Sequence, residues 1–104
     1  MHTTKVAISA ASSGDNTLLA AITGKAIRVH SLFFIASSAV NIRFESAAGG
    51  TALTGVMEFA ANGGMVLPFN PDGWFETVAG ELLNLELSGA VGVRGAFAYS
   101  KVPV

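Results

Sequence analysis

The stretch Leu67-Pro68-Phe69-Asn70-Pro71-Asp72-Gly73-Trp74-Phe75 holds two of the three prolines, the only tryptophan and the sharpest turn signal of the chain. Pro68 cannot donate a hydrogen bond to a sheet ladder, so the strand that contains it is expected to lie at a sheet edge or to end there. Residues 70–73 fit a tight turn, with proline second and glycine fourth. We therefore expect an architectural corner between two strands.

Outward from this corner, apolar residues alternate with other side chains, which is typical of strands buried on one face. The clearest case is Val40, Ile42 and Phe44, which alternate with Asn41, Arg43 and Glu45. Residues 17–22 fit a short helix or a strand, and the strand is favoured because about six residues are few for a helix. The other predicted strands span residues 5–11, 25–36, 51–60, 65–69, 74–79, 83–88 and 91–99.

Turn signals separate these runs. Residues 12–16 are expected to form a loop, and residues 47–50 and Asn62-Gly63 are expected to close hairpins. Gly55 indicates a bulge within residues 51–60. Eight or nine short strands at a spacing of roughly ten residues predict an all-β, antiparallel sandwich or barrel. At 104 residues the chain is expected to form one domain over residues 1–104, with residues 1–5 as a flexible N-terminal arm.

The composition is unusually apolar for so short a chain. Hydrophobic residues make up 51% and charged residues only 12%, against a usual charged share of about 25%. A small domain has proportionally more surface and should therefore be more polar. We expect other chains to cover part of its apolar surface, so the sequence predicts a homo-oligomer.

Charge and residue usage exclude several classes of partner. The net charge is −1 and the six basic residues form no cluster, so neither nucleic acid nor an acidic membrane is expected as a partner. There is no cysteine, hence no disulfide or thiolate metal site. No signal peptide is expected at the start, and no apolar run approaches the roughly 18 residues that cross a bilayer.

No catalytic set converges in the sequence, and we expect no enzyme activity, metal or cofactor. His30 has no carboxylate or nucleophile near it in sequence, which favours a structural role. Seven carboxylates are spread over turns and polar faces. The pairs Asp15-Asn16 and Asn70/Asp72 offer oxygen ligands for calcium, but neither approaches the ligand count of an EF-hand loop. No Gly-x-Ser-x-Gly elbow or phosphate loop is present.

Four apolar residues are candidates for a contact with a partner. Leu32 and Phe34 are expected on the face of residues 25–36 that also carries Arg28 and His30, so the apolar end of that face needs cover. Trp74 and Phe75 are adjacent, so one ring is expected in the core and the other outside. The outer ring would meet a neighbouring subunit, because aromatic side chains are enriched at interfaces; stacking on a sugar or nucleobase is the alternative.

Several segments together resemble small virion proteins of tailed bacteriophages. They are Ser-Gly-Asp-Asn-Thr at 13–17, Gly-Lys-Ala-Ile-Arg-Val at 24–29, Val-Asn-Ile-Arg-Phe at 40–44, Asn-Gly-Gly at 62–64, residues 67–77, Gly-Glu-Leu-Leu-Asn-Leu at 80–85 and Gly-Ala-Phe-Ala-Tyr at 95–99. In size and strand pattern the chain is also similar to capsid decoration (cement) proteins. Those are typically jelly-roll-like modules that sit as trimers on the outside of the head.

The resemblance implies a jelly-roll-like antiparallel β-sandwich of about eight strands that forms a homotrimer. It implies a virion protein, made in the host cytoplasm, that binds the major capsid protein and stabilises the head. The alternative is a receptor- or carbohydrate-binding module of a phage tail fibre or spike. That module would use Trp74, Phe75 or Tyr99 as a platform on which a sugar ring stacks.

Overall fold

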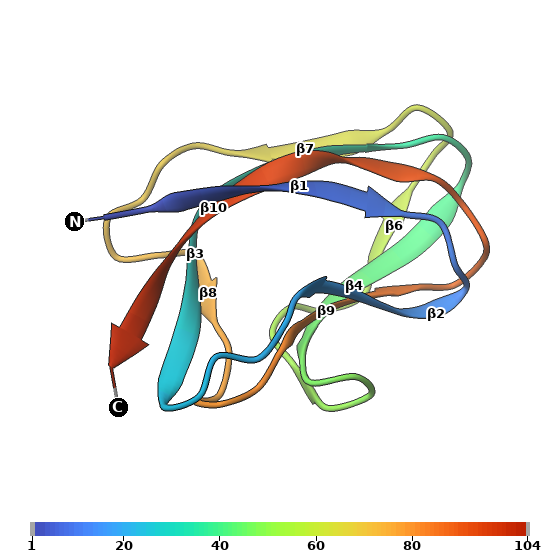
Figure 1. Cartoon of the computed structure of the whole chain (residues 1–104). Coiled ribbons are helices and arrows are strands. Elements are labelled where there is room, and N and C mark those ends of the chain that lie inside the picture. The colour runs from blue at the N-terminus through green and yellow to red at the C-terminus, as the bar shows by residue number, and fades with distance from the viewer. Residues whose placement is uncertain (1, 104) are drawn as a thin grey trace.

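The computed structural model describes residues 2–103, which form two antiparallel sheets packed face to face. Figure 1 shows β1, β10 and β7 in the upper layer and β2, β9 and β4 in the lower layer. Within residues 2–103, no helix is long and apolar enough to span a membrane. The strands are β1 (Thr4–Ala10), β2 (Gly14–Leu19), β3 (Lys25–Ala36), β4 (Val40–Ser46), β5 (Thr51–Ala52), β6 (Met57–Phe59), β7 (Gly64–Leu67), β8 (Phe75–Glu76), β9 (Leu83–Leu87) and β10 (Val93–Pro103).

Each sheet has four strand positions. The first sheet has the order β1-β10-β3-β7, and β8 also pairs with β3. The second has the order β2-β9-β4-β5, and β6 also pairs with β4. Between successive strands the chain crosses from one sheet to the other at β1–β2, β2–β3, β3–β4, β6–β7, β8–β9 and β9–β10, which is the jelly-roll arrangement of eight strand positions. The predicted jelly-roll-like antiparallel sandwich is therefore confirmed.

The core lies between the two sheets and is built from their alternating inner positions. The rings of Phe34 in β3 and Phe44 in β4 meet across it, with centroids 6.2 Å apart. Phe34 also meets Phe59 edge-on at 5.2 Å. Burial on one face of each strand is what the period-2 pattern predicts. The largest fully buried apolar side chains are Phe34, Phe44, Phe97, Ile8, Ile27, Leu32, Ile42, Leu83, Leu85 and Leu87.

A bulge in β3 changes which of its residues face the core. Tyr99 of β10 pairs with Val29, but the preceding Ala98 pairs with Ser31, so His30 is an extra residue with no partner on β10. A one-residue shift moves every following side chain to the opposite face. Ile27 and Val29 are therefore buried before the bulge, and Leu32 and Phe34 after it. The uninterrupted alternation predicted for residues 25–36 is wrong.

The predicted flexible arm over residues 1–5 is wrong for its last two residues. Thr4 and Lys5 belong to β1 and pair with Tyr99 and Ala98 of β10, because their main chain completes the edge of the first sheet. Met1 lies outside the described residues. The loop predicted for residues 12–16 is also shorter, since β2 already begins at Gly14.

One predicted hairpin is confirmed and one is wrong. Residues 47–50 join β4 to β5, which pair directly. Asn62-Gly63 instead carries the chain from β6, paired with β4, to β7, paired with β3 in the other sheet. This turn is held by hydrogen bonds with the end of β3, from Ala36 N to Gly63 O and from Asn62 N to Ala36 O, each 2.8 Å. The strand predicted across residues 51–60 is likewise broken into β5 and β6.

The corner at residues 67–75 forms as predicted. β7 is an edge strand that ends at Leu67, immediately before Pro68. The tight turn is closed by a hydrogen bond from Gly73 N to Asn70 O at 2.9 Å. Gly73 has φ of +82°, a conformation that glycine adopts without steric cost. Trp74 then donates its indole Nε1 to Pro68 O at 2.8 Å, which ties the two ends of the corner together.

Candidate functional site

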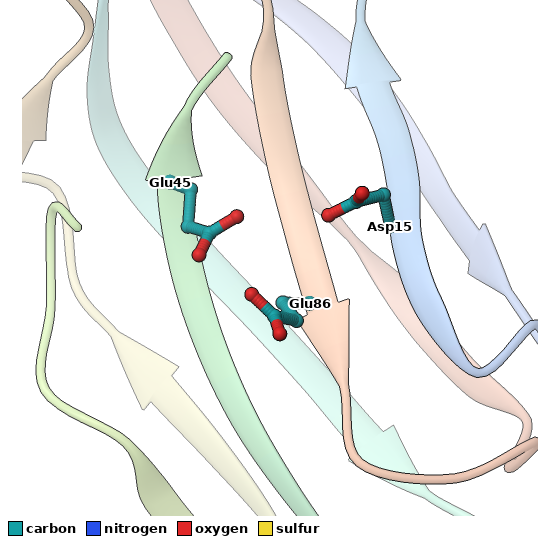
Figure 2. Close-up of side chains that lie close together, drawn as sticks. All are labelled: Asp15, Glu45 and Glu86. Atoms are coloured by element: carbon teal, nitrogen blue, oxygen red, sulfur yellow. The ribbon is translucent and has the colours of Figure 1, made fainter. Parts of the chain in front are cut away.

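A cluster of charged and polar side chains lies on the outer face of the second sheet. Asp15 comes from β2, Glu86 from β9 and Glu45 from β4, and Figure 2 shows their three carboxylates turned toward one another. Strand pairing brings them together, because Asp15 is opposite Glu86 and Glu45 is opposite Asn84. Arg43 lies opposite Glu86 on the other side.

Hydrogen bonds connect every member of this cluster. Asn84 donates Nδ2 to Asp15 Oδ1 and to Glu45 Oε1, both at 2.9 Å. Arg43 donates Nε to Glu45 Oε2 at 2.9 Å and also binds it through Nη2. The same Nη2 binds Glu86 Oε2 at 3.0 Å. Glu45 thus uses one oxygen toward Asn84 and the other toward Arg43.

The centre of the cluster is buried although it lies on an outer face. Glu45 and Asn84 are both 0% exposed, whereas Asp15 is exposed and Glu86 is partly exposed. The Oδ1 of Asn84 is buried and has no hydrogen-bond partner. One carboxylate oxygen from each of Asp15, Glu45 and Glu86 lies within 4.8 Å of the others. Burying a carboxylate or an amide oxygen without a partner lowers the stability of the fold, and such groups are rare in folded proteins. The cluster is therefore unusual.

The two glutamates of the cluster influence each other's pKa in opposite directions. Burial acts to raise the pKa of Glu45, but hydrogen bonds with Glu86, Arg43 and Asn84 and the charge of Arg43 outweigh it and lower the pKa. The hydrogen bond with Glu45, followed by the charge of Glu45 and by burial, raises the pKa of Glu86 against the opposing effect of Arg43. The interaction with Glu45 thus favours the protonated form of Glu86, while Arg43 and Asn84 favour the charged form of Glu45.

Glu86→Gln is expected to gain stability relative to the wild type as the pH rises. The folded chain holds the Glu86 proton more tightly than the unfolded chain, because the pKa is raised on folding. The wild type therefore loses this contribution between the ordinary glutamate pKa of about 4.3 and the raised value, while the glutamine variant has no such proton to lose. Urea unfolding midpoints measured over this pH range test the direction of this change in stability. A chelator is added so that no bound metal ion contributes.

Glu58→Gln, at an exposed position of β6, serves as the control for this pH series. The quantity to follow is the urea midpoint of Glu86→Gln minus that of the wild type. If this value stays constant or falls as the pH rises, the pKa of Glu86 is not raised on folding.

Among the hollows at the surface of the described residues, two are relevant to these side chains. One, of about 170 Å³, adjoins the cluster and is lined by Asn41, Ile42, Arg43, Val56, Glu86 and Ser88. The other, of about 210 Å³, lies beside the start of β1 and the end of β10 and is lined by His2, Thr4, Tyr99, Ser100 and Lys101. Neither brings His30 together with carboxylates.

His30 lies beneath the 67–75 corner in a structural setting. Its Nδ1 lies 2.8 Å from Asn70 O, and its Nε2 lies 2.7 Å from Ser100 Oγ. The ring of Phe69 stacks on it with centroids 5.6 Å apart. Both ring nitrogens are engaged and the side chain is 0% exposed, so His30 helps to hold the corner on the sheet.

The predicted contact residues divide between core and surface. Leu32 and Phe34 are 1% and 2% exposed; the second sheet of their own chain covers them, so their prediction as contact residues is wrong. Phe75 is half-buried and packs on Phe44, with ring centroids 5.1 Å apart. Trp74 remains 43% exposed. One ring of the pair thus faces the core and the other faces outward, as predicted.

The structure exposes a different apolar set on β3 and its neighbour. Phe33 and Ile35 of β3 are 52% and 59% exposed, and Val66 of β7 is 75% exposed. Phe33 is directly opposite Val66 in the sheet. The apolar character of these residues is evident in the sequence, but the bulge at His30 decides that they face outward. The sequence does not predict the cluster around Glu45 for a similar reason. Its members are polar positions of three strands that are distant in sequence.

No known protein family, curated protein or solved structure matches this chain. Its function is therefore inferred from its own surfaces and contacts.

Proposed function

We propose that this chain is a structural virion protein, which assembles with copies of itself and decorates the outside of a bacteriophage head to stabilise the capsid. The observation that carries the proposal is the apolar outer face of the first sheet, defined by Phe33, Ile35 and Val66. The jelly-roll fold agrees with the resemblance to decoration proteins, although a fold by itself does not specify a function.

The apolar outer face extends across the whole width of its sheet. The strand register places Ala7 of β1, Ala96 of β10, Phe33 of β3 and Val66 of β7 in one row. Two large side chains thus lie beside two small ones, and this row carries no charge; the exposed Arg94 of β10 lies beside it, opposite Ile35. Clustered exposed apolar side chains of this kind mark sites that another chain covers.

Binding to a capsid would rely on contact rather than on charge. With a net charge of −1, the chain has little field to steer it toward a partner. Weak individual contacts become strong when several linked copies bind together, since the second and third contacts are intramolecular. A homotrimer that covers a junction between major capsid protein subunits would gain stability in this way and would hold those subunits together.

The double variant Phe33→Ser/Ile35→Ser is expected to convert the assembled wild type into single chains. Both side chains are more than half exposed, so their replacement removes apolar contact area between chains while the core of each chain stays intact. Light scattering at micromolar concentration measures the mass, and Val56→Ser is the control, since Val56 is 59% exposed on the second sheet's side of the fold. A wild-type mass of one chain would contradict the assembly.

Binding to heads tests the second half of the proposal. The purified chain is mixed with phage heads that lack it, and co-sedimentation measures how much binds. Wild-type chain should saturate the heads, and Phe33→Ser/Ile35→Ser should bind far less because avidity is lost. No co-sedimentation of the wild type would contradict the decoration role while leaving self-assembly untouched.

A receptor- or carbohydrate-binding module is the second candidate, favoured by two exposed aromatic rings of the 67–75 corner. Phe69 is 56% and Trp74 43% exposed, and exposed aromatic faces can stack on sugar rings. Phe75 and Tyr99 are too well covered for this role, since Tyr99 is 7% exposed. A glycan array separates the two candidates: hits that Trp74→Ala abolishes without changing the mass of the assembly would favour the module.

A further inference from the structure

We propose that Asp15, Glu45, Glu86 and Asn84 form a binding site for a calcium ion on the outer face of the second sheet. The site joins three neighbouring strands, β2, β9 and β4. It lies apart from the apolar outer face of the first sheet and does not depend on the proposed capsid role.

The carboxylates are close enough to share one ion. One oxygen from each of Asp15, Glu45 and Glu86 lies within 4.8 Å of the other two. Calcium binds oxygen at about 2.3–2.6 Å, so ligands on opposite sides of the ion stand about 4.6–5.2 Å apart. The available ligands are carboxylate and amide oxygens without histidine or cysteine, a set that suits a hard cation rather than zinc or copper.

Asn84 provides independent support for a ligand at this place. Its side chain is fully buried and its amide lies between two of the carboxylates, with Nδ2 at 2.9 Å from both Asp15 Oδ1 and Glu45 Oε1. Its Oδ1 is buried without any hydrogen-bond partner, which is rare in folded proteins. A half-turn of the amide about its Cβ–Cγ bond exchanges Oδ1 with Nδ2. The oxygen then faces the two carboxylates, where an ion would bind all three, and Nδ2 takes the buried position that Oδ1 leaves.

The charge of the cluster matches a divalent ion. When ionised, the three carboxylates carry three negative charges and Arg43 supplies one positive charge, so two negative charges are left. Arg43 binds Oε2 of both Glu45 and Glu86, while Glu45 Oε1 accepts from Asn84 Nδ2 and from Gly49 N. The ion can therefore bind on the Asn84 side without displacing Arg43.

The remaining coordination positions are open to water. Calcium takes 6–8 oxygen ligands in flexible geometry, and the four side chains supply only part of that number. Asp15 is exposed and Glu86 is partly exposed, so water can reach the ion from the outer side. An ion held in this way binds the folded chain and not the unfolded one, and it therefore stabilises the fold by mass action.

Thermal unfolding and calorimetry of the full chain test the site. After treatment with a chelator and its removal, millimolar CaCl₂ should raise the Tm of the wild type by several degrees, and titration calorimetry should report one ion per chain. An unchanged Tm together with no heat of binding would overturn the proposal. A Tm rise with MgCl₂ but not with CaCl₂ would overturn the assignment of calcium.

Asp15→Asn is the decisive variant, because Asp15 is exposed and its replacement should leave the fold intact. It removes one charged ligand, so the rise in Tm with CaCl₂ should be largely lost. Glu58→Gln, an exposed carboxylate outside the cluster, is the matched control and should keep the full rise. A calcium-dependent rise of equal size in Asp15→Asn would overturn the site, since the ion would then bind elsewhere.

Discussion

Phe34→Ala is expected to lower the free energy of unfolding by about 3–5 kcal/mol, the usual cost of removing a buried phenylalanine ring. Phe34 is 2% exposed and its ring meets Phe44 and Phe59 from the opposite sheet. The cavity that the substitution leaves therefore lies at the contact between the two sheets. Small domains have a total stability of about 5–15 kcal/mol, so this one change removes a large share of it. Urea unfolding followed by Trp74 fluorescence measures the loss.

The adjacent Phe33 is the matched control for this prediction. It lies on the same strand, but its side chain is 52% exposed on the outer face. Phe33→Ala should change the unfolding free energy by no more than about 0.5 kcal/mol at dilutions where chains are separate. If Phe34→Ala lowered the assembled mass and left the unfolding free energy unchanged, Phe34 would be a contact residue after all.

Gly95→Ala is expected to destabilise the chain at the upper end of the roughly 1–3 kcal/mol that overpacking costs. Gly95 lies in β10 opposite Phe34 of β3, in the centre of the first sheet. A Cβ at this position would lie 2.7 Å from Phe34 Cα and closer still to the carbonyl oxygen of Phe33. Both atoms belong to the main chain, so no rotamer change relieves the clash and the two strands must separate.

Gly55→Ala provides the control for the glycine prediction. No atom lies within 4 Å of a Cβ built there, so this variant should unfold within about 0.5 kcal/mol of the wild type. Denaturant midpoints of the two variants, measured side by side, give the comparison. Equal midpoints for Gly95→Ala and Gly55→Ala would show that β10 and β3 do not approach as closely as the structure has them.

The candidate site shows how far local patterns reach. The sequence places Glu45, Asn84 and Glu86 at polar positions of alternating strands, which predicts that they face away from the core. Nothing local predicts that β2, β9 and β4 are neighbours in one sheet, because they are joined through strands of the other sheet. The convergence of Asp15 with Glu45 and Glu86, and the burial of Asn84, follow only from that pairing.

Patterns in the sequence predict most of the strands, the corner and the class of fold, but they merge β5 and β6 into one strand. Period-2 alternation is a local property, and proline at 68 and 71 with glycine at 73 restricts the backbone within a few residues. The tertiary structure alone decided which faces are covered. The pairing of β3 with β10 makes His30 the extra residue of a bulge, and the single shift turns Leu32 and Phe34 inward and Phe33 and Ile35 outward. A strand's alternation therefore predicts which residues share a face only between bulges, and the pairing with distant strands decides where a bulge falls and which face meets the core.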